Sequence, residues 1–273
     1  MFGEMLKKVR SNAPLIHNIT NYVTVNDCAN ILLALGASPI MSDEEAEVEE
    51  ITSICGGLNI NIGTLNERTI SSMHKAGKKA NELGHPVLLD PVGVGASALR
   101  TRTALELLDT VKFSVIRGNI SEIKTLAYGS GTTRGVDADI ADVVTIKNLG
   151  KTVEFAKEFA KKRKTVVVIT GAIDVVADEK KAYCIYNGDS MMSSITGTGC
   201  QLSAMTTAYI TANKENILEA AAAAVCAMGV CGEIAKERLC KEDGNASYRN
   251  YIIDAVYGLH PKQLDERARY EVF

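Results

Sequence analysis

The chain has 273 residues, of which 46% are apolar and 23% are charged, and its formal net charge is −3. This is the composition of an ordinary globular protein, and the charge argues against a general affinity for nucleic acid or acidic membranes. No apolar run reaches the length of a membrane span, and the N-terminal segment lacks an apolar signal core, so we expect a cytoplasmic protein. The length suits one large α/β domain over residues 1–273.

Along the first two thirds of the chain, short apolar runs typical of buried strands alternate with longer stretches of helical spacing. The expected strands cover residues 58–62, 86–90, 114–116 and 165–169. Among the expected helices, one carries the apolar face of residues 25–35, another runs from a cap at Asn66 to about Leu83, and a third begins at Asn119. Such alternation predicts a mostly parallel sheet with helices on both faces.

The pattern changes after Thr170. Two apolar runs, 175–177 and 182–186, flank a charged turn and predict an antiparallel hairpin at an edge of the sheet. The last third is helical, over residues 202–211, 217 to about 240 and 248–256. The middle helix is rich in alanine and apolar on nearly every face, so we expect it to pack closely against the sheet. The most loop-like stretch is 129–137.

Polar residues stand where the expected strands end, and the ligands of an open parallel sheet bind beyond those ends. Asp90 precedes a Pro/Gly loop and suits a metal or another polar ligand, although an aspartate before proline often only starts a turn. Arg117 suits a phosphate. Glu122 suits a hydrated metal ion and equally completes a capping box with Asn119. Thr170 ends a further strand with a hydroxyl group, which alone says little.

The stretch Gly197-Thr198-Gly199-Cys200 lies where a loop becomes a helix. Its glycines let a ligand approach the backbone, and the unpaired amides of the first helical turn form an anion site with the helix dipole. Such a site would stabilise the charge that a phosphoryl group carries during transfer, although a plain glycine turn has the same spacing. Taken with the strand ends, the turn predicts a small-molecule kinase that phosphorylates an alcohol. No Walker-type phosphate loop is present.

At these residues the sequence resembles the hydroxyethylthiazole kinases of the ribokinase-like superfamily. The segments that carry the resemblance are 14–21, 35–41, 90–96, 117–122 and 196–200. The resemblance implies a ribokinase-like fold and the phosphorylation by ATP of the hydroxyethyl group of 4-methyl-5-(2-hydroxyethyl)thiazole, a salvage step toward thiamine. It also implies Mg²⁺ as cofactor and a homotrimer whose active sites lie between neighbouring subunits.

The resemblance also implies roles for individual residues. They are, for the thiazole, Met41, Asn21 and Gly197; for ATP, Arg117 and Thr170; for magnesium, Asp90 and Glu122; and for the anion hole, Gly197, Thr198 and Gly199. The wider superfamily usually ends the glycine turn with an aspartate that acts as the base, whereas Cys200 agrees with the thiazole kinases and is the implied proton acceptor. We expect the helix N-terminus to lower the pKa of its thiol from about 8.5. The alcohol stays protonated until late in a loose transition state, so this help should be modest.

Other interpretations stay open. Seven cysteines without any Cys-x-x-Cys pair argue against a disulfide scaffold or a zinc site. A thiol nucleophile would need a histidine partner, and His17, which stands in a motif-like segment, is expected to be structural or to line the pocket. A hydroxymethylpyrimidine kinase of the same fold is disfavoured by Cys200 and by residues 17–21. A nucleotide-binding sensor without turnover is disfavoured by the intact glycine turn and the charged residues at the strand ends.

Overall fold

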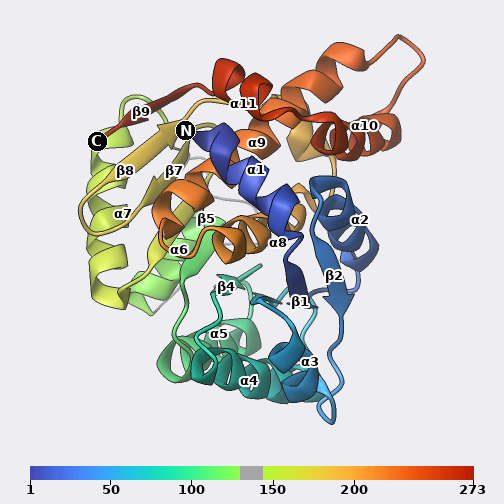
Figure 1. Cartoon of the computed structure of the whole chain (residues 1–273). Helices are drawn as coiled ribbons and strands as arrows, with labels where there is room; N and C mark the ends of the chain where they lie inside the picture. The colour runs from blue at the N-terminus through green and yellow to red at the C-terminus, as the bar shows by residue number, and fades with distance from the viewer. Residues whose placement is uncertain (130–143) are drawn as a thin grey trace.

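The computed structural model describes residues 1–129 and 144–273. Its centre is one sheet, whose strands follow the order β2-β1-β3-β4-β5-β6-β7-β8-β9 (Figure 1). The strands are β1 (Leu15–Ile19), β2 (Ser38–Met41), β3 (Gly57–Asn61), β4 (Val87–Asp90), β5 (Val115–Asn119), β6 (Val166–Thr170), β7 (Asp174–Ala177), β8 (Ala182–Ile185) and β9 (Tyr270–Val272). The strands β1 to β6 run parallel and the remaining three pair antiparallel, which confirms the predicted mostly parallel sheet.

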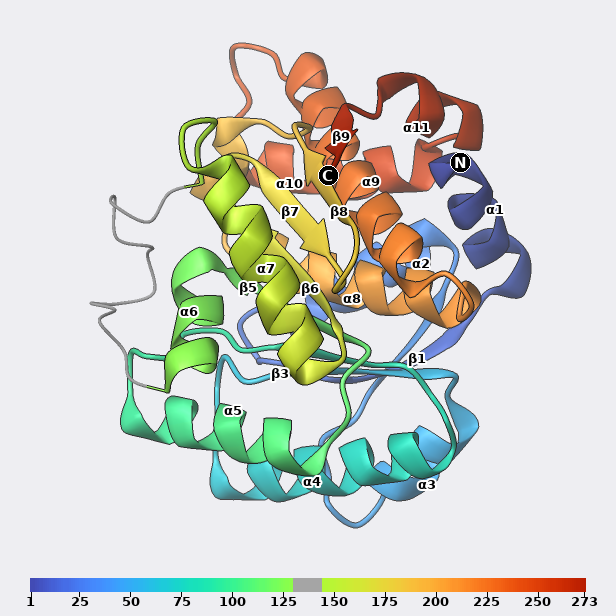
Figure 2. The same ribbon diagram turned by 90° about the vertical axis from the view of Figure 1, so that its left-hand side faces the viewer.

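Helices cover both faces of the sheet, as predicted (Figures 1 and 2). They are α1 (Phe2–Asn12), α2 (Val25–Leu35), α3 (Val48–Ile54), α4 (Glu67–Glu82), α5 (Ala98–Thr110), α6 (Ile120–Tyr128), α7 (Leu149–Arg163), α8 (Thr198–Ala212), α9 (Ile217–Arg238), α10 (Asn245–Gly258) and α11 (Pro261–Arg267). Successive strand side chains point to opposite faces. Leu88 therefore packs in the core with α1, α2 and α8 to α10, while Val87 and Leu89 pack in the core with α4 to α7.

The four predicted strands are present as β3 to β6, and the predicted hairpin is present as β7 and β8. The strand β1 escapes prediction because His17 and Asn18, both buried, interrupt its apolar pattern. The strand β2 contains Pro39 and is half-buried along its length at the other edge of the sheet. The hairpin lies on the antiparallel side of the sheet, as predicted, and the exposed strand β9 pairs with β8 and extends that side by one strand.

The helix α9 corrects a prediction. By length and composition it is apolar enough to cross a membrane, with a mean hydropathy of 1.7, although no apolar run of that length was expected. Of the most apolar 18 residues of this helix, 78% are buried. The helix packs against β6, β7, β8, α8 and α10, so its apolar faces belong to the core, as predicted. Of the predicted loop 129–137, only Gly129 lies within the described residues, where its left-handed backbone ends α6.

Two predicted helix starts are confirmed by side-chain caps. Asn66 Oδ1 accepts a hydrogen bond from Thr69 N at 3.0 Å, and Thr69 Oγ1 accepts one from Asn66 N at 3.1 Å. Asn119 and Glu122 form the same reciprocal pair, with both hydrogen bonds at 2.8 Å. The second box fixes the Glu122 carboxylate beside the end of β5, at the edge of the sheet where the polar strand-end residues gather.

Candidate active site

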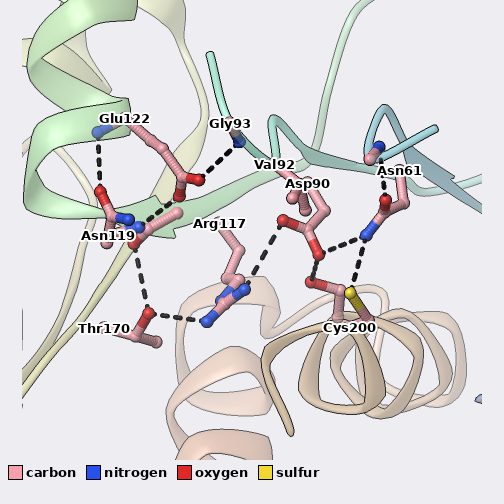
Figure 3. Close-up of polar contacts among 12 residues, drawn as sticks. Asn61, Asp90, Val92, Gly93, Arg117, Asn119, Glu122, Thr170 and Cys200 are labelled. Atoms are coloured by element: carbon pink, nitrogen blue, oxygen red, sulfur yellow. Dashed lines mark hydrogen bonds and ion pairs between the residues drawn. The ribbon is translucent and has the colours of Figure 1, made fainter. Parts of the chain in front are cut away.

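The polar ends of neighbouring strands and the start of α8 come together at one edge of the sheet, in a connected row of side chains (Figure 3). Asp90 ends β4 and is in register with Asn61 at the end of β3. Thr170 ends β6 beside the end of β5, which carries Arg117. Cys200 reaches the row from the first turn of α8. The carboxyl ends of parallel strands share an edge, so this gathering follows from the fold.

Asp90 is the centre of the row and is fully buried. Its Oδ2 atom accepts hydrogen bonds from Asn61 Nδ2 and Ser203 Oγ, each at 2.8 Å. Its Oδ1 atom lies 3.5 Å from Arg117 Nη1 and has no hydrogen bond to the part of the chain that the structure describes. Burial raises the pKa of Asp90, and the neighbouring Arg117, Ser203 and Asn61 oppose that rise. The carboxylate is thus held in place through Oδ2, while its buried Oδ1 atom has only the guanidinium of Arg117 beside it.

Arg117 joins the strand ends to the glycine turn. Its Nη2 atom donates a hydrogen bond to Thr170 Oγ1 at 2.7 Å, while Nη1 faces Asp90. The guanidinium also lies against the backbone of Gly199, where an added Cβ atom would be 2.5 Å from Nη1. Gly199 is therefore needed for space and not for an unusual backbone angle. A guanidinium held on two sides in this way is preorganised to bind phosphate oxygens.

The glycine turn starts α8 earlier than the sequence predicted, at Thr198. Gly197 precedes the helix with a φ of 89°, a left-handed conformation that favours glycine, and an added Cβ there would lie 2.5 Å from Thr24 Cγ2. The first hydrogen bond of the helix runs from Gln201 N to Gly197 O at 2.9 Å. The amides of Thr198, Gly199 and Cys200 precede that bond, so they can face an anion with the positive end of the helix dipole behind them.

Cys200 is buried, like five more of the seven cysteines, all of which are free thiols. Its Sγ atom accepts hydrogen bonds from Asn21 Nδ2 at 3.2 Å and from Asn61 Nδ2 at 3.3 Å. The pKa of the thiol is raised, not lowered as the sequence predicted, because burial and the nearby Asp90 carboxylate disfavour a thiolate. These two effects outweigh the hydrogen bonds from Thr24 and Asn21. The thiol therefore keeps its proton at neutral pH.

Asn21 links the thiol to the start of α2. Besides Cys200, its Nδ2 atom reaches Asn61 Oδ1 at 3.0 Å, and its Oδ1 atom accepts hydrogen bonds from Thr24 N and Oγ1, both at 3.1 Å. Met41 is the last residue of β2 and so lies at the same carboxyl ends of the strands, where it pairs with Asn18 of β1. Its side chain is half-buried against the core that contains Cys200. The predicted residues on this side thus share one end of the sheet, and Asn21 touches Cys200 directly.

Glu122 fills the capping role that the sequence left open, and its second carboxylate oxygen contacts the loop after Asp90. Its Oε2 atom caps α6 through Asn119 N, while its Oε1 atom accepts a hydrogen bond from Gly93 N at 2.8 Å in the loop after Asp90. Burial and the Asp90 carboxylate raise the pKa of Glu122 to about 7. Two buried carboxylates that disfavour each other's charge would gain from a cation between them.

The acidic pair fits a hydrated magnesium ion. Mg²⁺ is usually bound by one or two carboxylates together with water and substrate phosphates, not by a complete protein cage. Asp90 and Glu122 supply that number, and the buried Oδ1 atom of Asp90 has no hydrogen bond to the described residues. The described residues contain no cluster of three or more His, Cys, Asp or Glu side chains that could hold a metal alone. The donor set thus suits a metal that arrives with a phosphate ligand.

A cavity of about 610 Å³ opens beside Arg117, Thr170, Thr198 and Gly199. Its further walls are the segment 186–193 after β8 and the apolar side chains Leu202, Val225 and Met228 of α8 and α9. The size and the mix of apolar walls with a few polar groups are those of a small-molecule site. Neither Asp90 nor Cys200 lines it. The row of Figure 3 therefore leads from the cavity to the thiol.

Sequence reasoning missed several parts of this site. Asn61 and Ser203 hold Asp90, yet neither stands in a motif that marks it out from the other polar residues of its strand or helix. One signal was available, because Asn59 and Asn61 alternate within a strand that is otherwise apolar and fully buried. The segment 186–193 has the composition of an ordinary loop and gave no signal. His17 is buried and hydrogen-bonded to Thr52 Oγ1 and Ser42 O. It is not one of the residues that interact with Cys200, which agrees with a structural role.

The family model described as the hydroxyethylthiazole kinase family matches residues 6–262 of the chain. A hydroxyethylthiazole kinase of Clostridium acetobutylicum is 67% identical over 273 residues, which are 100% of this chain and 100% of that protein. A hydroxyethylthiazole kinase of Methanobrevibacter smithii is 42% identical, over 98% of this chain and 96% of that protein. The match thus extends over the whole site and not over isolated motifs.

Solved structures agree with the sequence matches. The structure of hydroxyethylthiazole kinase protein from Pyrococcus horikoshii OT3 is 36% identical to the chain, with a TM-score of 0.88, and the match covers 100% of this chain and 98% of that one. The pyridoxal kinase from Staphylococcus aureus, solved with AMP-PCP and pyridoxal, has a TM-score of 0.61 at 15% identity over 95% and 98% of the two chains. At that identity the likeness shows the fold alone, and it confirms the ribokinase-like architecture.

Proposed function

The chain belongs to the hydroxyethylthiazole kinase family, and we propose that it uses the site described above to transfer the γ-phosphoryl group of ATP to the hydroxyethyl group of 4-methyl-5-(2-hydroxyethyl)thiazole. It is a thiazole kinase of thiamine salvage. The observation that carries the choice of site is the row from Thr170 through Arg117, Asp90 and Asn61 to Cys200. That row joins the cavity to the start of α8 without a gap.

The cavity would hold ATP, with Arg117 and Thr170 against its phosphates. The Arg117 fork presents N–H donors in a geometry that matches phosphate oxygens. The free amides at the start of α8 would face the phosphoryl group in transfer, whose charge spreads over its equatorial oxygens. Asp90 and Thr170 already hold Arg117 in place, and Gly197 already shapes the turn. Little reorganisation is then needed when charge develops, which is how preorganised donors lower a barrier.

Asp90 and Glu122 would hold Mg²⁺, which supplies positive charge that binds phosphate oxygens and offsets their charge during transfer. The two carboxylates have different supports. Asn61 and Ser203 orient Asp90, and backbone amides orient Glu122. Both side chains are therefore fixed before any ligand binds, so the site loses little conformational entropy on loading.

On the other side of the row, Met41, Asn21 and Gly197 would contact the thiazole. Its hydroxyl group would then lie beside Cys200, and the N–H groups of Asn21 and Asn61 that point at Sγ would stabilise a thiolate when one forms. We propose that this thiolate accepts the alcohol proton late in the transfer. Burial and Asp90 keep the thiolate scarce at neutral pH, so its share of the rate is modest.

The function is tested by the formation of ADP from ATP and Mg²⁺ when the thiazole alcohol is added. We expect ADP to appear only with that alcohol present, and hydroxymethylpyrimidine to give little in comparison. A reaction without the alcohol measures background ATP hydrolysis. Tight binding of ADP without any thiazole-dependent turnover would favour a sensor and defeat the kinase assignment. Preferred turnover of hydroxymethylpyrimidine would instead identify the protein as a hydroxymethylpyrimidine kinase.

Replacing Cys200 by alanine is expected to lower kcat by up to about 10²-fold, the lower range for general-base help. The pKa of the thiol is raised, so wild-type kcat should climb from about pH 7 and keep climbing beyond the ordinary thiol pKa of about 8.5 as thiolate forms, and this climb should vanish in Cys200→Ala. Cys200→Asp restores the residue usual in the wider superfamily and should stay active. Steady-state rates across that pH range check all three statements.

The matched control for Cys200 is Cys55→Ala, which removes a buried thiol whose pKa is also raised, to about 11, by burial. It should leave the pH profile unchanged. Full turnover in Cys200→Ala would refute the role as proton acceptor. A folded Cys200→Asp protein without turnover would equally count against it.

We further propose that residues 1–273 are one catalytic domain that acts in the cytoplasm as a homotrimer with shared active sites. Apolar side chains next to the thiazole side support the assembly, since Tyr22 is 78% exposed directly after Asn21, and Val23 and Leu33 are each 58% exposed. Light scattering should give three times the chain mass of 29.3 kDa. A Tyr22→Glu variant should shift the mass toward the monomer and lose turnover together, whereas a fully active monomer would contradict the shared site.

A further inference from the structure

One wall of the cavity is held by parts of the chain that do not line it. The segment after β8 contributes Tyr186, Asn187 and Gly188 to the cavity. Outside the cavity, the carboxylate of Glu233 on α9 and the C-terminal residues 267–271 bind this segment from behind. Figure 1 shows the C-terminal strand β9 lying beside β8, next to where that segment begins.

Glu233 collects three hydrogen bonds on one oxygen atom. Its Oε1 atom accepts from Asn187 Nδ2 at 3.1 Å, from Gly188 N at 2.9 Å and from Arg269 Nη2 at 2.7 Å. The Glu233 side chain is only 17% exposed, so these bonds to a charged acceptor are stronger than surface ones. A single carboxylate therefore joins the cavity wall to both α9 and the C-terminal segment.

The C-terminal segment completes the support. The backbone of Arg269 bonds to the wall twice, since Arg269 O accepts a hydrogen bond from Tyr186 N at 2.9 Å and Arg269 N donates one to the side-chain Oδ1 of Asn187 at 2.7 Å. Asn187 Nδ2 also donates to Arg267 O at 2.9 Å, and Tyr186 Oη donates to Glu271 Oε2 at 3.0 Å. Two residues of the wall thus depend on the end of the chain for their polar contacts.

Close packing against α9 fixes the same segment sterically. A Cβ atom added at Gly229 would lie 2.7 Å from the carbonyl carbon of Asn187, and one added at Gly232 would lie 2.5 Å from Met192 Sδ. These glycines stand three positions apart on one face of the helix, where neighbouring turns meet the same partner. The two glycines therefore let the wall lie close against α9, where Glu233 of the same helix reaches it.

We propose that Glu233 and residues 267–271 position the wall segment 186–188 and so set the affinity of the cavity for nucleotide. They act through the wall, because neither Glu233 nor Arg269 is among the residues that line the cavity. A wall that leaves its binding position for part of the time weakens the apparent affinity in proportion to the competent fraction. The inference rests on the proposed function in one respect, that the ligand of this cavity is an adenine nucleotide.

The test is calorimetric binding of ADP to the full-length protein, with KM for ATP and KM for the thiazole alcohol measured beside it. Glu233→Ala is expected to weaken ADP about tenfold and to raise KM for ATP alike, while KM for the alcohol changes less than about twofold. Glu233→Gln keeps an acceptor oxygen and should fall between wild type and Glu233→Ala. If Glu233→Ala does not fold, Arg269→Ala can replace it, because the Arg269 side chain is 59% exposed. It should also weaken ADP binding and raise KM for ATP while leaving KM for the alcohol nearly unchanged.

The matched control is Glu219→Ala on the same helix. Glu219 also ties α9 to β8 and the turn before it, through Tyr183 Oη at 3.4 Å and Lys181 Nζ at 3.0 Å, but none of these residues lines the cavity. It should lower Tm without changing ADP affinity. Equal losses of ADP affinity in Glu219→Ala and Glu233→Ala, or an unchanged affinity in Glu233→Ala, would overturn the inference. Wild-type protein that binds no ADP would overturn it too, whereas ADP binding without thiazole turnover would defeat only the proposed function.

Discussion

Replacing Gly197 by alanine is expected to lower kcat about 10²–10³-fold, the loss typical of one displaced donor in an anion hole. Gly197 holds a φ of 89°, and its added Cβ would lie 2.5 Å from Thr24 Cγ2. Thr24 cannot move freely, because its N and Oγ1 atoms both bond to Asn21 Oδ1. The variant must therefore shift the turn, and with it the amides that would face the phosphoryl group. Steady-state kinetics with saturating substrates measure the loss.

The same substitution should also destabilise the fold, by about 1–3 kcal/mol for the backbone angle with the collision in addition. Gly84→Ala is the matched control, since Gly84 has a φ of 67° but open space around its Cβ and lies between α4 and β4, away from the site. It should lose stability and keep kcat. Thr24→Ser removes the Cγ2 methyl and keeps the hydroxyl bonded to Asn21, so adding it to Gly197→Ala should recover part of the loss. Full turnover in Gly197→Ala would refute the anion hole.

A strand could be predicted where its own residues show the pattern, and not where it depends on partners that are distant in the sequence. The strands β3 to β6 are buried on both faces, so their apolar runs identify them from local sequence. The strand β9 is exposed, and nothing in its three residues predicts a strand until β8 is beside it. In β1, the buried His17 is satisfied by Thr52 and Ser42 from elsewhere in the chain. Its polarity therefore concealed a core strand.

The site divides in the same way. Asp90, Arg117 and Thr170 could be found because a parallel sheet places the ends of its strands together. The pKa of Cys200 could not, because the helix N-terminus is a local feature whereas burial and the charge of Asp90 come from the tertiary structure. Ser203 supports Asp90 from α8 across a contact that neither residue's neighbours in sequence reveal. Sequence pattern thus located the site, and the tertiary structure decided its electrostatics.

Replacing Arg117 by alanine is expected to lower kcat/KM for ATP by at least about 10²-fold, because the site loses a preorganised donor to the phosphates. It should also cost about 3–5 kcal/mol of unfolding free energy, since Asp90 stays fully buried without the cation 3.5 Å from its Oδ1 atom. The pKa of Asp90, already raised by burial, would rise further. A carboxyl whose folded pKa is raised loses stability as pH climbs above its unfolded value of about 4. The deficit against wild type should therefore be smallest in acid and grow toward neutral pH, as urea unfolding at several pH values will measure.

The double variant Arg117→Ala with Asp90→Asn separates the two roles of the arginine. An asparagine oxygen can still accept the hydrogen bonds from Asn61 and Ser203, and the buried charge is gone, so most of the lost stability and its pH dependence should be removed. Turnover should stay low, because the donors to phosphate are still missing and one of the two magnesium carboxylates has been replaced. Asp90→Asn alone shows how much of that loss belongs to the carboxylate. If Arg117→Ala lost stability but kept its kcat/KM for ATP, the guanidinium would be only the counter-ion of Asp90, and its contact with ATP would be refuted.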